Sequence, residues 1–125
     1  MYGQNFKSRF DWYDGRHVWD LKTCRDASPR GFKQAINVYR YHMQASLYVD
    51  ACKSLGLPVE GFSFLAQEKA HPYPYVVYEL EPEAVEYGRS LNEQALDLLL
   101  KCEQTGIYTP YNLHNQIVPI KLTDL

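Results

Sequence analysis

FDWYDGRHVWDLK, residues 10–22, is the stretch that decides the fold. It predicts two short strands joined at Asp14-Gly15, because an Asp-Gly pair between aromatic and β-branched residues supplies the positive φ angles of a tight hairpin turn. Asp11 then lies on the first strand, and Asp20 and Lys22 lie on the second.

The second strand is expected to carry a carboxylate and an ammonium on one face. Side chains alternate along a strand, so Asp20 and Lys22 share a face and Leu21 points the other way. A hairpin in register also brings Asp11 close to this pair. The predicted patch places three charged groups among large apolar residues, where a charge is costly unless it is paired or binds a metal.

Two explanations of this patch remain open. A salt bridge between Lys22 and one aspartate is the simpler one, since an isolated Asp-x-Lys triplet is common by chance. Alternatively, the two carboxylates hold a hard divalent cation, Mg²⁺ or Mn²⁺, through oxygen ligands. The lysine would then orient, or help to deprotonate, a metal-bound water that attacks phosphorus.

The segments after the hairpin follow a characteristic order. They read LKTCRDASPRGF, YRYHMQASLYVDA, FSFLAQEKAHPY, a helical segment with YGR, and a final GIYTPY. Together with the Asp, hairpin, Asp-x-Lys arrangement, this succession resembles the PD-(D/E)xK nuclease superfamily. Within it, the order resembles the nuclease domain of RecE (exodeoxyribonuclease VIII) and its phage-borne relatives, over about residues 9–111. Each motif alone is unspecific, whereas their order and spacing are fairly specific.

The resemblance implies an α/β fold, a mixed and mainly antiparallel central sheet flanked by helices. We expect one domain over residues 1–125, with a core at 1–111 and a tail at 112–125. RecE-like domains usually begin with a substantial helical region, whereas here the first strand comes almost at once. The alternative to an active enzyme is therefore a truncated, catalytically inactive DNA-binding or assembly module that keeps the fold.

The resemblance also implies a function, a metal-dependent exonuclease that hydrolyses phosphodiesters at duplex DNA ends in phage-type recombination. Asp11, Asp20 and the backbone carbonyl of Leu21 would bind Mg²⁺ or Mn²⁺, and Lys22 would position the water. The implied partners are double-stranded DNA ends, a RecT-type single-strand annealing protein, and further copies of the chain in a ring.

Gln44 and Tyr48 lie four residues apart and so point from one face of a predicted helix. An amide can hydrogen-bond a phosphate oxygen or the lysine, and a tyrosine hydroxyl can do the same while its ring packs. Alone, such a pair is more often a buried hydrogen bond and a core aromatic. Behind the Asp-x-Lys hairpin, the resemblance implies that both orient the scissile phosphate.

Charge and cysteine content restrict the remaining possibilities. The formal net charge is −2, so DNA contact requires a local basic cluster, for which we select Arg9, Arg25, Lys33 and Arg40. A solvated basic face is an equal alternative. The three cysteines lack zinc-ligand spacing and cannot supply a four-cysteine cluster, which favours reduced thiols and a cytoplasmic location. No signal peptide or membrane span is predicted.

The other predicted elements are helices over about 29–38 and 40–55, strands over 60–67 and 75–80, and a long helix from Pro82 to Gly106. His42 is expected at the surface, and the strand that carries Lys22 is expected to end there. The predicted core stripes of the three helices are Phe32, Ala35, Ile36 and Tyr39; Met43, Leu47, Ala51 and Leu55; and Val85, Leu91, Ala95, Leu98 and Leu99.

Overall fold

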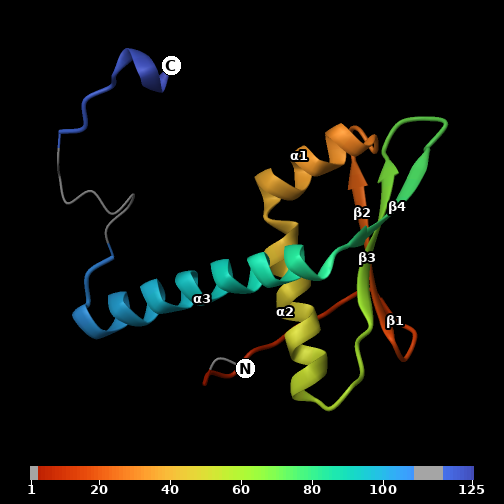
Figure 1. The fold of residues 1–125 in the computed structure, drawn as a ribbon, viewed down its shortest axis with the longest axis horizontal. Coiled ribbons are helices and arrows are strands. Elements are labelled where there is room, and N and C mark those ends of the chain that lie inside the picture. The colour runs from red at the N-terminus through yellow and green to blue at the C-terminus, as the bar shows by residue number, and fades with distance from the viewer. Residues whose placement is uncertain (1–2, 109–116) are drawn as a thin grey trace. The chain divides into compact units, whose positions relative to one another are not determined.

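The structure is a computed structural model that describes residues 3–108 and 117–125, in two compact units, 1–95 and 96–125. The first unit holds the sheet, two complete helices and the first part of a third (Figure 1). In chain order the elements are β1 (Trp12–Tyr13), β2 (His17–Cys24), α1 (Pro29–Tyr39), α2 (Tyr41–Ser54), β3 (Gly61–Glu68), β4 (Tyr75–Leu80), α3 (Pro82–Thr105) and a 3-10 turn, η2 (Leu122–Asp124).

The sheet has the strand order β1-β2-β3-β4. β2 pairs with β1 in the antiparallel sense and with β3 in the parallel sense, and β3 and β4 are antiparallel. The parallel pair requires a crossover connection, which α1 and α2 provide. The predicted fold class, a mixed and mainly antiparallel sheet with helices against it, is confirmed.

The core lies between one face of the sheet and helices α1 and α2. Side chains alternate between the two faces of each strand, and Val18 of β2 and Phe64 of β3 point to the helices. Phe32 of α1 meets Phe64 edge to face, with 5.6 Å between the ring centroids. The residues buried here are Val18, Ala27, Phe32, Ala45, Tyr48, Val49, Cys52, Phe62, Phe64 and Ala66.

The β1-β2 hairpin forms as predicted, but its turn is shifted by one residue. Tyr13 pairs with Val18, and of the turn residues only Gly15 has a positive φ, 97°. Asp14 Oδ1 accepts hydrogen bonds from the N–H groups of Arg16 (2.9 Å) and His17 (2.7 Å). Asp14 therefore opens the turn through its side chain, and the centre is Gly15-Arg16 rather than Asp14-Gly15.

The strand that carries Lys22 is longer than expected. β2 continues through Cys24, because its pairing with β3 extends to Thr23 opposite Gln67 and Cys24 opposite Glu68. The strand therefore ends only after Cys24. Helix α1 then begins as predicted, with Pro29 in its first turn and the Ser28 hydroxyl accepting from Gly31 N–H at 3.2 Å.

The buried face of α2 differs from the predicted stripe. His42, expected at the surface, is 3% exposed, whereas Leu55 is 76% exposed. The reason is that α3 also packs on α2, so closely that a Cβ at Gly88 would lie 2.1 Å from the carbonyl oxygen of His42. Because α2 packs on both the sheet and α3, its buried residues differ from the predicted stripe, which was spaced by four residues. They are His42, Ala45, Ser46, Tyr48, Val49 and Cys52.

Several predicted core positions are exposed. Tyr39 is 67% exposed at the end of α1, and Leu98 and Leu99 of α3 are about half exposed. Ala95 is exposed too, and Gly88 is the buried residue of α3. Helical spacing indicates an apolar stripe without showing how much of it a neighbouring element covers. No helix in the described ranges is both long and apolar enough to pass through a membrane.

The second unit contains the end of α3 and the turn η2. Four apolar residues near its C-terminal end, Ile117, Val118, Ile120 and Leu122, are exposed. Of the predicted aromatic closing segment, Tyr108 is 64% exposed, and Tyr111 lies outside the described residues.

Candidate active site

Four predicted site residues form one connected polar chain. Lys22 Nζ lies 2.7 Å from Asp20 Oδ2 and donates to Gln44 Oε1 at 2.6 Å. Gln44 Nε2 in turn donates to Tyr48 Oη at 2.8 Å. Strand β2 supplies the two charges and α2 supplies the amide and the phenol, because the face of β2 that carries Asp20 and Lys22 is the face that α2 covers.

The chain is largely withdrawn from solvent. The side chains of Lys22 and Asp20 are 16% and 5% exposed. Asp20 Oδ2 is buried, and the ammonium of Lys22 at 2.7 Å balances its charge. A buried oxygen of this kind is costly unless a cation or donor satisfies it.

Asp11 completes the predicted group of charges. It lies just before β1, and its Oδ2 accepts from Leu21 N–H at 2.8 Å. A hydrogen bond from the Asp20 carboxyl, followed by the bond from Leu21, lowers the pKa of Asp11. Burial, followed by the hydrogen bond with Asp11, raises the pKa of Asp20, against the opposing effect of Lys22. The two carboxyl groups are therefore adjacent, and the buried one resists ionisation.

Tyr48 is held on several sides by other rings. Phe10 meets it edge to face at 5.8 Å, and Phe62 lies 6.3 Å away. Burial raises the pKa of its hydroxyl. A neutral phenol that accepts from Gln44 keeps its own O–H free to donate.

Tyr41 belongs to the site and was missed by the sequence analysis. Lys22 Nζ lies over its ring, 4.4 Å from the centroid. The ring is itself fixed by Phe32, Tyr39 and Phe64, at centroid distances of 6.0, 5.6 and 5.9 Å. The available signal was its position three residues before Gln44, one helical turn away on the same face.

The four predicted DNA-contacting residues, Arg9, Arg25, Lys33 and Arg40, are all exposed. Arg9 is close enough to help lower the pKa of Asp11, and Arg40 separates α1 from α2 with φ 58°. Their role in DNA contact stays a prediction. Within residues 3–108 and 117–125, no group of three His, Cys, Asp or Glu side chains is arranged to hold a metal ion.

Glu68 pairs with Cys24 at the end of the two parallel strands. Its Oε2 accepts from Ala27 N–H at 3.1 Å, which ties the loop before α1 to the end of β3. Lys69 N–H bonds to the carbonyl of Cys24 at 3.0 Å. Both residues therefore stabilise the ends of the parallel strand pair.

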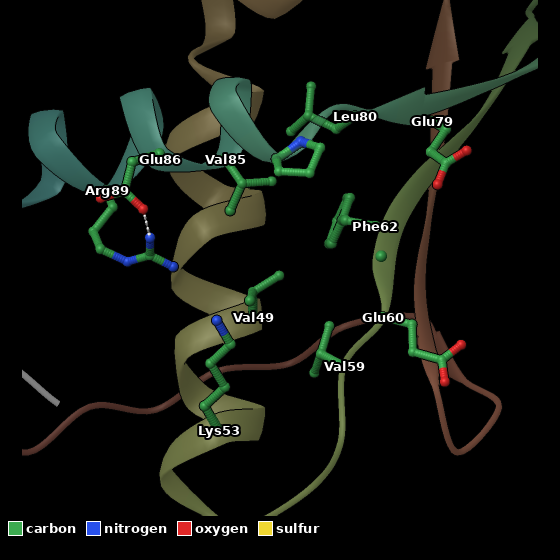
Figure 2. Close-up of a pocket in the computed structure, with 12 residues that line it drawn as sticks. Val49, Lys53, Val59, Glu60, Phe62, Glu79, Leu80, Val85, Glu86 and Arg89 are labelled. Atoms are coloured by element: carbon green, nitrogen blue, oxygen red, sulfur yellow. Dashed lines mark hydrogen bonds and ion pairs between the residues drawn. The ribbon is translucent and has the colours of Figure 1, made fainter.

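A separate pocket of about 310 Å³ lies between α2, the β3-β4 pair and the start of α3 (Figure 2). Its apolar wall includes Val49, Phe62 and Val85. On the helix side, Arg89 pairs with Asp50 at 2.6 Å and with Glu86. None of Asp20, Lys22 and Gln44 lines this pocket, so the polar chain and the pocket are different places.

The class of protein follows from this fold and site. A mixed sheet that carries Asp and Asp-x-Lys beside a helix with Gln-x-x-x-Tyr is the arrangement of a PD-(D/E)xK domain. The chain belongs to the family described as "PDDEXK-like domain of unknown function (DUF3799)", whose model matches residues 1–111.

A solved structure shows the same fold. It is the crystal structure of a protein from Eubacterium rectale named "Putative exonuclease", with a TM-score of 0.71 and 16% sequence identity. The match covers 99% of this chain and 52% of that one, so the chain spans about half the length of that protein. No curated protein matches the sequence.

Proposed function

We propose that this chain is a metal-dependent nuclease that hydrolyses DNA phosphodiesters. The observation that carries the proposal is the connected group Asp20, Lys22, Gln44 and Tyr48, with Asp11 beside Asp20. An ordinary surface salt bridge would leave Lys22 and Asp20 in solvent, whereas here both are largely buried and linked to a helix amide.

The donor set fits a hard divalent cation. Asp11 and Asp20 present adjacent carboxyl groups, and one oxygen of Asp20 is buried beside the Lys22 ammonium. The backbone N–H and C=O of one strand residue point toward the same neighbouring strand. Because Leu21 N–H points to Asp11, the Leu21 carbonyl is directed to the same side and can be a third ligand. Mg²⁺ or Mn²⁺ bound there would polarise a phosphoryl oxygen and acidify water.

The other residues have separate tasks. Lys22 places its ammonium beside the Asp20 carboxyl, where it can orient a water and stabilise negative charge that develops on phosphate. Gln44 fixes Lys22 and Tyr48 at the same time, since it accepts from one and donates to the other. The hydroxyl of Tyr48 can then donate to a phosphate oxygen. Gln44 thus acts mainly as a bridge, and Tyr48 is the more direct phosphate contact.

The finer proposal is a RecE-like exodeoxyribonuclease that acts at double-stranded DNA ends in phage-type recombination. It rests on the order of motifs along the chain. Arg9, Arg25, Lys33 and Arg40 would contact DNA, a RecT-type annealing protein would receive the single strand, and several copies would form a ring. The exposed apolar side chains of α3, Leu98 and Leu99, are compatible with such assembly.

One observation favours a second candidate, an inactive DNA-binding or assembly module with the same fold. The predicted metal set has two carboxylates, and the described residues add no third one. A module of this kind would retain DNA binding and lack turnover.

The test is release of nucleotides from linear duplex DNA in Mn²⁺, for the parent, Asp20→Ala and Lys22→Ala. Lys53→Ala, which removes an exposed lysine outside the site, is the matched control. Release by the parent and the control, lost in both site variants, supports the nuclease. A folded parent that binds DNA without releasing nucleotides supports the inactive module. Covalently closed circular DNA tests the need for an end.

A further inference from the structure

The ammonium of Lys22 has three neighbours of different kinds. Asp20 supplies a charge at 2.7 Å, Gln44 supplies a carbonyl oxygen at 2.6 Å, and Tyr41 supplies the face of its ring at 4.4 Å from the centroid. The negative face of an aromatic ring attracts a cation, and the attraction grows when the pair is withdrawn from water. The Lys22 side chain is only 16% exposed, so it is largely withdrawn from water.

We propose that Tyr41 is a positioning residue for Lys22, whose ring face holds the ammonium toward Asp20 and Gln44. A lysine has a flexible four-carbon stem and would otherwise sample several directions. Of the three N–H donors of the ammonium, one bonds to Gln44 and one faces Asp20. The Tyr41 ring blocks one side of the ammonium, so the third donor points to the open side of the site. This role rests on the proposed function, since it concerns the direction in which the ammonium of the proposed catalytic lysine points.

The ring is suited to this task because it cannot easily move. Tyr41 is the first residue of α2, directly after Arg40. Phe32 from α1, Phe64 from β3 and Tyr39 surround it. Three elements therefore determine the position of one ring, and through that ring they determine the direction of Lys22.

The experiment compares Tyr41→Phe, which keeps the ring, with Tyr41→Leu, which keeps only apolar volume. Tyr75→Leu is the control, because it removes an exposed ring on β4, outside the group of rings around Tyr41. The first measurement needs no activity: the NMR shifts of the Lys22 Cε protons, which a ring face moves upfield. We expect the upfield shift in the parent, Tyr41→Phe and Tyr75→Leu, and its loss in Tyr41→Leu.

The second measurement is DNA cleavage in Mn²⁺. We expect Tyr41→Leu to lower kcat about tenfold with KM for DNA unchanged, and Tyr41→Phe to restore kcat. An upfield shift that survives in Tyr41→Leu, or equal loss of kcat in both Tyr41 variants, overturns the inference. If the parent does not cleave DNA but the shifts behave as expected, the proposed function fails and the positioning role stands.

A third variant covers the case in which Tyr41→Leu does not fold. Pentafluorophenylalanine at position 41 keeps the shape of the ring and reverses the sign of its face. We expect it to lower kcat relative to Tyr41→Phe and to displace the Lys22 shifts. Equal kcat and equal shifts in these two ring variants would show that only packing matters.

Discussion

Lys22 on the central strand β2 donates to Gln44 on helix α2 across 2.6 Å, and Gln44 is itself bonded to Tyr48. One amide thus satisfies a charged donor and a phenol at once. The contact joins a strand residue to a helix residue 22 positions later, so the geometry of the site depends on how α2 packs on the sheet.

The first prediction concerns Gln44→Leu. The change keeps apolar volume but leaves the buried Lys22 and Tyr48 without their shared partner, so we expect a loss of about 1–3 kcal/mol in the free energy of unfolding. Urea unfolding of the purified protein measures it. Gln34→Leu, at an exposed position of α1, should change stability by less than about 0.5 kcal/mol. Equal effects of the two substitutions would contradict the bridging role.

The second prediction concerns metal binding. Mn²⁺ that binds only the folded state should raise the free energy of unfolding by about 2.7 kcal/mol at a hundredfold excess over its Kd. Thermal melting with and without Mn²⁺ measures the rise as a higher Tm. Asp11→Asn should abolish it, whereas Asp97→Asn, at an exposed position of α3, should leave it intact. A rise that persists in Asp11→Asn would place the metal elsewhere.

The third prediction concerns pH and His42. Burial, with a smaller effect of Arg40, lowers the pKa of this imidazole from the ordinary 6.5. Its ring stacks on Tyr87 of α3 at 5.4 Å, both ring nitrogens are buried, and a hydrogen bond to the Ile36 backbone opposes the shift only in part. Because the pKa is lowered on folding, the unfolded chain binds the proton more readily. Stability is therefore complete above about pH 6.5 and falls as the pH drops below it.

Replacement of the imidazole tests this pH dependence. Urea unfolding of the parent between pH 5 and pH 7.5 should show the decline, and His42→Phe should flatten it while retaining an aromatic partner for Tyr87. His71→Phe, at an exposed loop position, should keep the slope of the parent. The interpretation fails if the slope is unchanged in His42→Phe.

The fourth prediction concerns Gly88. In most helices Gly→Ala stabilises by about 0.5–1 kcal/mol, but here the new Cβ would meet the His42 carbonyl oxygen at 2.1 Å and Met43 N at 3.1 Å. We expect Gly88→Ala to lose about 1–3 kcal/mol instead. Chemical unfolding decides the sign, with Gln94→Ala on the exposed face of α3 as the control. A stabilised Gly88→Ala protein would show that the two helices separate readily.

The fold was predictable where the local sequence signals were strong. Alternating strands, the Ser28-Pro29 helix start and the proline and glycine boundaries gave the element order, with most ends correct within one or two residues. The arrangement of the candidate site residues was predictable because Asp20 and Lys22 share a face by strand periodicity, and Gln44 and Tyr48 share one by helix periodicity.

What sequence could not give was the packing of one element on another. His42 is buried because α3 crosses α2 at Gly88, a contact between residues far apart in the chain. Tyr41 joins the site because α1, α2 and β3 meet around its ring. The turn moved by one residue because the Asp14 side chain, rather than the backbone alone, shaped it.

The parallel pairing of β2 with β3 also determines when the site can form during synthesis. Asp20 pairs with Phe64 and Lys22 pairs with Ala66. The strand that carries both charges can therefore pair with β3 only after residue 66 has left the ribosome. Until then the nascent chain contains Asp11, Asp20, Lys22 and Gln44 without the sheet that buries them. Such a chain must close a long loop first, which is a slow kind of step in folding.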